Sequence, residues 1–246
     1  MRVPSGYLAD RSHGVLSIAR PAARALVVEA LQTHGSLYAF AKARAKRTLQ
    51  GRASAYVMDA PDGPWVVRHY VRGGAVARIL TDRYLRIGPR RPLAELRISA
   101  LARSRGIETP AVAAVAIYND GFFYRGDIAT DLVPDAADLA EIAAGPDRLE
   151  ESQRLLAWQA AGRLVRSVGD AGLIHADLNV RNILVGWRAG LPHAHLLDLD
   201  RCRIVRRVRA GELRAMVRRF ERSARKLEKK VPIARELDAF RAACRV

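Results

Sequence analysis

Two aspartates, an asparagine and a histidine have a spacing that suits the binding and transfer of phosphate groups. The central segment reads His175-x-Asp177-Leu178-x-x-x-Asn182, and Asp198 follows after an apolar run. Transfer of a phosphoryl group depends on positioning and on neutralisation of charge more than on covalent chemistry. One carboxylate must face the attacking hydroxyl, while another carboxylate and an amide oxygen hold Mg²⁺ on the phosphates. Asp177 is therefore the candidate base, and Asn182 and Asp198 are the candidate metal ligands.

Two apolar runs predict how Asp198 returns to Asn182. Residues 183–185 have the pattern of a strand, residues 187–193 form a polar turn, and Leu196-Leu197 lead back to Asp198. This is a hairpin that places its two ends side by side. Asp and Asn between apolar runs are also common turn formers, so a purely structural role is the alternative. His175 has its own alternative, in which it only orients the loop backbone.

The order of these residues is similar to the catalytic loop of the protein-kinase-like fold. The fold class expected is α+β, bilobal, with a small antiparallel-sheet N-lobe and a mainly helical C-lobe. Residues 1–47 are expected to be a basic, partly helical extension, with short helices at residues 22–31 and 38–47. Residues 48–132 are expected to form the N-lobe, with a nucleotide-covering sheet and a helix, and residues 133–246 the helical C-lobe with the catalytic loop.

A predicted strand that begins at residue 65 carries the candidate phosphate-binding cation. Strand alternation places Val66 and Arg68 on one face. Kinases hold the phosphates with a lysine here, but no lysine lies between Lys46 and Lys226. Arg68 is therefore the candidate, with Val66 beside the adenine, and an exposed strand residue is the alternative. Glu95, on a predicted helix, is expected to pair with Arg68, although a solvated glutamate is equally consistent.

The remaining nucleotide contacts are predicted from position in the fold. Gly51 and Ser54 lie in a turn between two predicted strands, where a kinase-like chain places its phosphate-covering loop. A plain hairpin turn fits this short segment as well. Further along, two predicted strands are joined at Asn119-Asp120-Gly121, which is a hairpin signal. The main chain of Asp131 and Leu132, at the exit of the second strand, is expected near the adenine.

The charge of the chain restricts its partners. There are 246 residues with 42 basic and 25 acidic side chains, which gives a net charge of +17. Such a field favours nucleic acid, anionic lipid or a phosphorylated glycolipid, and an arginine-rich genome is the alternative explanation. No apolar run is long enough to span a membrane, and no secretory signal is seen at residue 1. The two cysteines, Cys202 and Cys244, are expected to be free thiols.

The chain resembles the kinases of 3-deoxy-D-manno-octulosonate (Kdo), in the lipopolysaccharide kinase family. The resemblance extends over about residues 49–225. The motifs that carry it are Val67-Arg68-His69-Tyr70-x-Arg72-Gly73-Gly74, Asp82-Arg83-Tyr84-Leu85, Glu95, Phe123-Tyr124-Arg125-x-Asp127, His175-Ala-Asp177-Leu-Asn179, Asn182-Ile-Leu and Asp198-x-Asp200-Arg201.

The resemblance implies transfer of the γ-phosphoryl group of ATP, with Mg²⁺, to the 4-hydroxyl of Kdo on a lipid A precursor. The implied partners are a Kdo-lipid A type glycolipid and an anionic membrane surface, at the cytoplasmic face of the bacterial inner membrane; no nucleic acid is expected. Arg181, Arg201 and Arg203 are candidates to bind the acceptor carboxylate, because arginine binds carboxylates in a bidentate way. Cys202 stands where the family usually has glycine.

Two other functions fit the same residues. One is a kinase of this fold that acts on another small molecule or on a protein, which a panel of acceptors would identify. The other is a non-catalytic basic protein that binds nucleic acid in a salt-sensitive way. The presence of Asp177, Asn182 and Asp198 together favours an enzyme, because a scaffold needs none of them.

Overall fold

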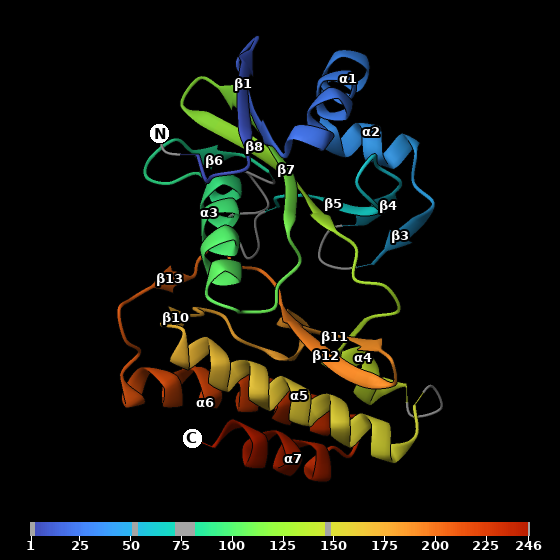
Figure 1. The fold of residues 1–246 in the computed structure, drawn as a ribbon, viewed down its shortest axis with the longest axis vertical. Helices are drawn as coiled ribbons and strands as arrows, with labels where there is room; N and C mark the ends of the chain where they lie inside the picture. The colour runs from blue at the N-terminus through green and yellow to red at the C-terminus, as the bar shows by residue number, and fades with distance from the viewer. Residues whose placement is uncertain (1–2, 51–53, 72–81, 146–148, 246) are drawn as a thin grey trace. The chain divides into compact units, whose positions relative to one another are not determined.

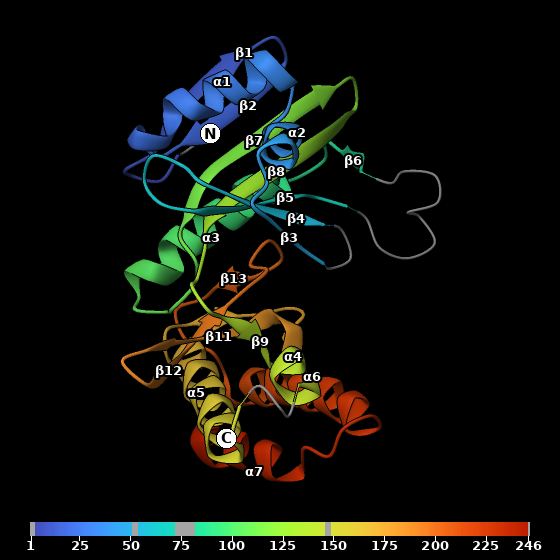
Figure 2. The ribbon, with the colours of Figure 1, turned by 90° about the vertical axis from the view of Figure 1, so that its right-hand side faces the viewer.

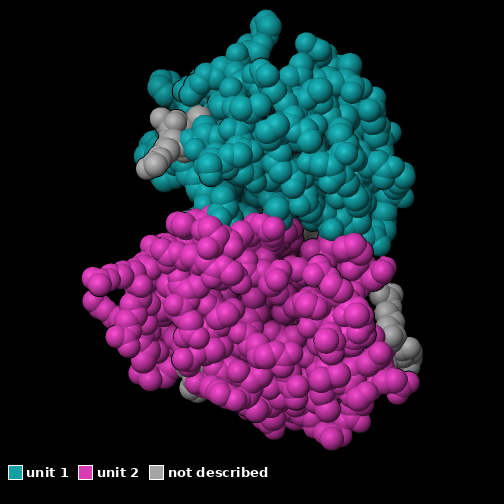
Figure 3. Space-filling model, in the orientation of Figure 1, with its two compact units in different colours: residues 1–100, 111–132 teal, residues 101–110, 133–246 magenta. Residues whose placement is uncertain are grey.

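The computed structural model describes residues 3–50, 54–71, 82–145 and 149–245. The chain forms two compact units, coloured teal and magenta in Figure 3: residues 1–100 with 111–132, and residues 101–110 with 133–246. Four residues singled out in the sequence, Gly51, Arg72, Gly73 and Gly74, lie outside the described residues.

Unit 1 is built on a single antiparallel sheet (Figures 1 and 2). The strand order is β1-β2-β7-β8-β5-β4-β3, and β6 pairs with β8 beside this path. The strands are β1 (Leu8–Ser12), β2 (Val15–Ala19), β3 (Arg47–Leu49), β4 (Ala55–Met58), β5 (Trp65–His69), β6 (Tyr84–Leu85), β7 (Val112–Asp120) and β8 (Phe123–Asp131). The expected antiparallel N-lobe is confirmed.

Helices cover both faces of this sheet. They are α1 (Arg24–His34), α2 (Leu37–Ala43) and α3 (Arg91–Ser104), with a short 3-10 turn, η1 (Pro21–Ala23), before α1. Alternate side chains of β7 separate the two cores, as strand geometry requires. Ala116 and Tyr118 pack in the cluster that contains α1 and α2, whereas Val115 and Ile117 pack in the cluster that contains α3.

The first 47 residues, expected as a basic extension before the N-lobe, are part of unit 1. β1 pairs with β2, and β2 pairs with the central strand β7. The two-residue turn His13–Gly14 has φ of 46° and 78°, which is the geometry of a tight hairpin. Leu16 and Ile18 of β2 are buried in the sheet core. The helix expected at residues 38–47 ends at Ala43, because the chain then enters β3.

Unit 2 is mainly helical, as expected. Its helices are α4 (Leu139–Ala144), α5 (Glu151–Asp170), α6 (Ala210–Glu228) and α7 (Ala234–Cys244). Short strands carry the loops: β9 (Ala137–Asp138), β10 (Leu173–Ile174), β11 (Ile183–Arg188), β12 (Leu191–Leu196) and β13 (Arg203–Ile204), with the 3-10 turn η4 (Val180–Asn182). Phe220 of α6 stacks on Phe240 of α7 at 4.1 Å between ring centroids, and Trp158 of α5 meets Phe220 edge-on.

The long helix α5 forms the middle of this core. Ala160, Leu164 and Val168 are buried, as their spacing predicts. Leu156 lies four residues before Ala160, at the same spacing, but it is 40% exposed. Ala157 is buried instead, since the inward face continues from Ala160 by three residues and not by four. Among the described residues no helix is long and apolar enough to cross a membrane.

Substitution of Gly172 tests how the chain is anchored just before the loop that contains Asp177. Its φ is +80°, and a Cβ there would lie 2.3 Å from the carbonyl oxygen of Val205. That carbonyl belongs to a tight pairing, since the Val205 N–H donates to Gly172 O at 2.8 Å. Gly172→Ala should therefore lower the free energy of unfolding by about 2–3 kcal/mol, measured by urea denaturation.

Gly190 provides the matched control for this substitution. Its φ is +77°, but nothing lies within 4 Å of the position that a Cβ would take. Gly190→Ala should cost only about 1 kcal/mol, the strain of the left-handed backbone alone. Equal losses of unfolding free energy in the two variants would show that the close approach of residue 172 to Val205 adds nothing to the cost of the substitution.

Candidate functional site

The loop between β10 and β11 holds Asp177 and Asn182 through side-chain amides. Asn182 Nδ2 donates to the carbonyl oxygen of Asp177 at 2.8 Å, and Asn179 Nδ2 donates to the same oxygen at 2.8 Å. Asn179 Oδ1 accepts from the N–H of Arg181 at 2.9 Å, which closes the turn. With its nitrogen engaged in this way, Asn182 retains Oδ1 as an acceptor for a cation or a donor.

His175 is buried and holds the backbone of the loop. Its Nδ1 accepts from the N–H of Asp177 at 3.2 Å, so the ring proton lies on Nε2. Nε2 then donates to the carbonyl oxygen of Leu197 at 2.9 Å. The imidazole thus connects the segment of Asp177 with the residue just before Asp198. This geometry favours the role of orienting the loop backbone.

The hairpin of β11 and β12 brings Asn182 and Asp198 to neighbouring strand ends, as the sequence predicts. Ile183 pairs with Leu196 at its open end. One residue further out, the N–H of Leu197 donates to the carbonyl oxygen of Asn182 at 2.9 Å. The strands extend further than expected, because Ala189 and Gly190 alone make the turn.

Asp198 has an unusual backbone, with φ of 61°. Few residues other than glycine adopt this region, although aspartate tolerates it better than most. Both main-chain groups of the preceding Leu197 are hydrogen-bonded, and the following Leu199 is buried, so the conformation is fixed from both sides. Such conformations cluster at functional sites.

The carboxylates of Asp177 and Asp198 are both exposed. Within the described part of the chain, neither has a hydrogen-bond donor or an ion-pair partner. The same residues contain no group of three or more His, Cys, Asp or Glu that could hold a metal on its own. Asn182 and Asp198 offer one amide and one carboxylate oxygen. Mg²⁺ prefers such oxygens and usually completes its shell with phosphates and water, so the donor set fits it.

The three candidate arginines lie in different surroundings. Arg181 forms an ion pair with Asp138 at 3.5 Å, and Arg203 forms one with Glu212 at 2.8 Å. Arg201 is exposed and makes no ion pair to any described residue. Arg203 lies in β13, opposite Ile174 of β10, which is the residue before His175. The sequence did not indicate that two of the three already have carboxylate partners.

The candidate residues of unit 1 include the predicted ion pair, which is confirmed. Glu95 of α3 is buried and accepts from both Arg68 Nη2 and the hydroxyl of Tyr70. The guanidinium of Arg68 also lies over the ring of Tyr70, 5.1 Å from its centroid. Val66 and Arg68 share the partly exposed face of β5, as the alternation predicts. The part played by Tyr70 was missed, because only the fold brings it to Glu95.

The main chain of Asp131 and Leu132, where β8 ends, forms hydrogen bonds within unit 1. The N–H of Asp131 donates to Ala111 O, and the N–H of Leu132 donates to Pro64 O, both at 2.9 Å. The Asp131 carboxylate accepts twice from Arg20, at 2.5 and 3.0 Å. The main-chain N–H groups of both residues therefore already have partners within the protein.

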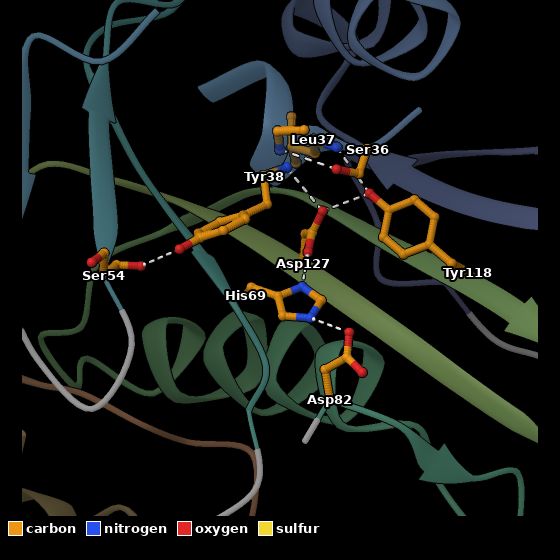
Figure 4. A network of polar contacts seen from close by, with 9 residues as sticks. Ser36, Leu37, Tyr38, Ser54, His69, Asp82, Tyr118 and Asp127 are labelled. Carbon is orange, nitrogen blue, oxygen red and sulfur yellow. Dashed lines mark hydrogen bonds and ion pairs between the residues drawn. The ribbon is translucent and has the colours of Figure 1, made fainter. Parts of the chain in front are cut away.

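A buried carboxylate of β8, opposite His69 of β5 in the sheet, organises a further set of side chains (Figure 4). Asp127 of β8 is fully buried and accepts from the N–H of Tyr38 at 2.9 Å and the hydroxyl of Tyr118 at 2.6 Å. Nδ1 of His69 lies 2.5 Å from a carboxylate oxygen of Asp127, and Nε2 of His69 lies 3.3 Å from a carboxylate oxygen of Asp82.

This network extends to the predicted phosphate-covering turn. The hydroxyl of Tyr38 donates to the carbonyl oxygen of Ser54 at 2.9 Å, so Ser54 is tied to the helix α2 that Asp127 anchors. His69, Asp82 and Asp127 all lie in motifs that the sequence singles out. Their spacing gives no signal that they meet, because the contacts join separate elements.

His69 should make the stability of the protein depend on pH. Burial disfavours its charged form, but the hydrogen bond and charge of Asp127, with those of Asp82, raise the pKa of His69 above its ordinary value. A raised folded-state pKa adds stability below the ordinary pKa of histidine, and that stability is lost as pH rises through the folded pKa. The free energy of unfolding should therefore fall as the pH rises from about 6.5, the ordinary pKa of histidine, through the raised folded-state pKa of His69.

The variant His69→Gln should lose this slope, with its largest deficit relative to wild type at the acidic end. His13→Asn is the control, since His13 is exposed in a turn and Asn tolerates its φ of 46°. It should keep the wild-type slope in urea denaturation. A His69→Gln protein whose deficit grows with pH would contradict the charged state assigned to this imidazole.

Comparison with known proteins was made for both sequence and structure. The lipopolysaccharide kinase (Kdo/WaaP) family matches residues 27–236. A "3-deoxy-D-manno-octulosonic acid kinase" of Stenotrophomonas maltophilia (strain K279a) is 38% identical over 153 residues, which are 61% of this chain and 58% of that protein. The protein of the same description from Xanthomonas axonopodis pv. citri (strain 306) is 37% identical over the same shares. The chain thus matches less than two thirds of the length of these relatives.

A solved structure has the same fold. The structure described as "WaaP in complex with acyl carrier protein" aligns with a TM-score of 0.53 at 16% identity, covering 89% of this chain and 86% of that one. At this identity the likeness speaks for the fold alone, and it agrees with the protein-kinase-like architecture expected from the sequence.

Proposed function

Because the chain belongs to the lipopolysaccharide kinase (Kdo/WaaP) family, we propose that it transfers the γ-phosphoryl group of ATP to the 4-hydroxyl of Kdo on a lipid A precursor. The observation that carries the proposal is the paired loop and hairpin of unit 2. They present Asp177, Asn182 and Asp198 from one hydrogen-bonded backbone. The description shared by the curated relatives supports Kdo as the acceptor.

Asp177 is the base in this proposal. Its carboxylate is exposed and has no partner among the described residues, so it is available to a substrate hydroxyl. The hydroxyl oxygen forms a bond to the γ-phosphorus as the bond from that phosphorus to the bridging oxygen of ADP breaks. The hydroxyl proton passes to Asp177, which is the usual arrangement in a loose phosphoryl-transfer transition state.

Asn182 and Asp198 would hold Mg²⁺ against the phosphates. When bound, the ion supplies charge neutralisation on the β- and γ-phosphate oxygens. In unit 1, Glu95 and Tyr70 fix the guanidinium of Arg68, which would neutralise phosphate as a planar fork and not as the point charge of a lysine. Val66, Gly51, Ser54 and main-chain groups of Asp131 and Leu132 would line the nucleotide.

The acceptor accounts for the basic surface of unit 2. Arg201 is proposed to bind the Kdo carboxylate, and Arg181 and Arg203 are further candidates for this contact. The face of α6 opposite its buried residues carries Arg214, Arg218 and Arg222 at intervals of four residues, all exposed. We propose that this face lies toward the anionic cytoplasmic leaflet of the inner membrane, where juxtamembrane cations are attracted.

Asp177→Asn tests the assignment of the base. Loss of a positioned general base typically costs a factor of 10²–10⁴, so kcat should fall at least about a hundredfold while the KM for ATP changes little. The assay is mass spectrometry of a Kdo-lipid A precursor after incubation with protein and Mg-ATP, with the gain of one phosphate as the signal.

Asp170→Asn is the control, since Asp170 is an exposed carboxylate at the end of α5 whose ion-pair partner among the described residues is the neighbouring Arg166. It should keep the wild-type rate. Wild-type kcat in the Asp177→Asn protein would overturn the role of Asp177. Absence of phosphate transfer to Kdo by the wild-type protein, together with transfer to another acceptor, would overturn the acceptor.

A further inference from the structure

Three large apolar side chains stand exposed at one end of the unit 1 sheet. Ile87 is 83% exposed, Phe122 is 85% exposed and Leu85 is 46% exposed. We call these three residues the apolar tip. Leu85 belongs to β6, Ile87 follows it, and Phe122 lies in the turn between β7 and β8.

The contacts of the main chain hold these residues in one place. Leu85 pairs with Phe123 across β6 and β8. The N–H of Arg86 donates to the carbonyl oxygen of Phe122, and its Nη1 donates to that of Gly121, both at 2.9 Å. The tip is therefore built from two chain segments that are bonded to each other, at the end of the sheet where β6 meets the β7–β8 hairpin (Figure 2).

The fold itself does not require large apolar side chains at these positions. The turn between β7 and β8 needs glycine at its first central position, and Gly121 fills it with φ of 53°. Phe122 occupies the second central position, where small polar residues serve equally well. Single exposed apolar residues are ordinary, but an exposed group of large ones marks an interaction site.

Arginines accompany the tip. Arg86, between Leu85 and Ile87 in the chain, is exposed and bonded to the β7–β8 turn, and Arg11 of β1 is also exposed. Partial burial and then the positive charges of Arg86 and Arg11 lower the pKa of Arg90. The nearby acidic residue, Asp120, forms an ion pair with Arg83 at 3.5 Å. A cluster of positive charges beside exposed apolar side chains is complementary to a surface with anionic groups on its outside and an apolar layer below them.

We propose that the apolar tip and its arginines dock on a bilayer that contains anionic lipids, with Phe122 and Ile87 inserted at the boundary between headgroups and acyl chains. Shallow insertion of apolar side chains combined with cationic attraction is the usual mode of interfacial binding. Three side chains offer roughly a few hundred Å² of apolar area, well below the ~800 Å² per partner of a stable protein interface. This inference rests on the proposed function only in that the acceptor is a lipid.

Sedimentation with vesicles of phosphatidylcholine and phosphatidylglycerol tests the assignment. The double variant Ile87→Ser/Phe122→Ser should lower the partition onto these vesicles at least about tenfold, because it removes the inserted apolar area. Leu191→Ser is the matched control, since Leu191 is 63% exposed on the hairpin of unit 2, and its partition should stay at the wild-type value. Arg86→Gln/Arg90→Gln should weaken binding most at low salt.

A second readout shows insertion directly. Tryptophan emission of Phe122→Trp should shift to the blue when vesicles are added, whereas that of Leu191→Trp should not. Wild-type partition by the double variant, or no blue shift in Phe122→Trp protein that sediments with vesicles, would overturn the proposal. A wild-type dimer that the double variant converts to a monomer would assign the tip to contact between copies and also overturn it.

Activity on a detergent-dispersed acceptor separates this inference from the proposed function. The double variant should keep wild-type activity there, because Ile87 and Phe122 have no place in the catalytic set. If wild-type protein transfers no phosphate even in detergent, the proposed function fails while the vesicle result stands. If the double variant loses activity in detergent as well as vesicle binding, the tip serves the chemistry or the fold and not the membrane.

Discussion

The hydrogen bonds of one buried imidazole connect the two segments of unit 2 that carry Asp177 and Asp198. His175 joins the N–H of Asp177 to the carbonyl of Leu197, and so fixes the two chain segments that carry the exposed carboxylates. Two carboxylates held near each other repel, so a rigid backbone is needed to keep them in place until a cation binds. The Asn182 amide adds a second tie to the carbonyl of Asp177. The helix α6 supports both, since Met216 accepts from the N–H of His175.

Unit 1 satisfies its buried charges in a different way. Each buried acid there has several donors: Glu95 has a guanidinium and a phenol, and Asp127 has a phenol, a main-chain N–H and an imidazole. A buried carboxylate without such partners would be costly, so these networks fix the strands they join. Asp177 and Asp198 differ, because they are exposed and lack protein partners among the described residues, so both carboxylates are available to a ligand.

The catalytic loop and its hairpin could be predicted because they are local. The order of His175, Asp177, Asn182 and Asp198, with apolar runs between, specifies a turn and a hairpin within about two dozen residues. The ion pair of Arg68 with Glu95 could be predicted only through the resemblance to kinases, since 27 residues separate the two.

Other features of the fold depend on long-range contacts, and the sequence pattern gives little indication of them. β1 has the polar sequence Leu-Ala-Asp-Arg-Ser, and it forms a strand because β2 pairs with it and with β7. The His13–Gly14 turn was the available clue. Asp127 receives donors from residues 9 to 89 positions away, which no spacing rule anticipates. The exposure of Ile87 and Phe122 follows from the pairing of β6 with β8, and apolarity alone would have predicted burial for both.

The most direct test of the account is whether Asn182 and Asp198 hold a metal with a nucleotide. Mn²⁺ can replace Mg²⁺ in this test, since free Mn²⁺ is measured by electron paramagnetic resonance during titration of the protein with ADP present. The account predicts a single Mn²⁺ site on wild-type protein, weakened at least about tenfold in Asn182→Ala and in Asp198→Asn, because each loses a ligand oxygen. Equal Mn²⁺ affinity in wild type and both variants would contradict it.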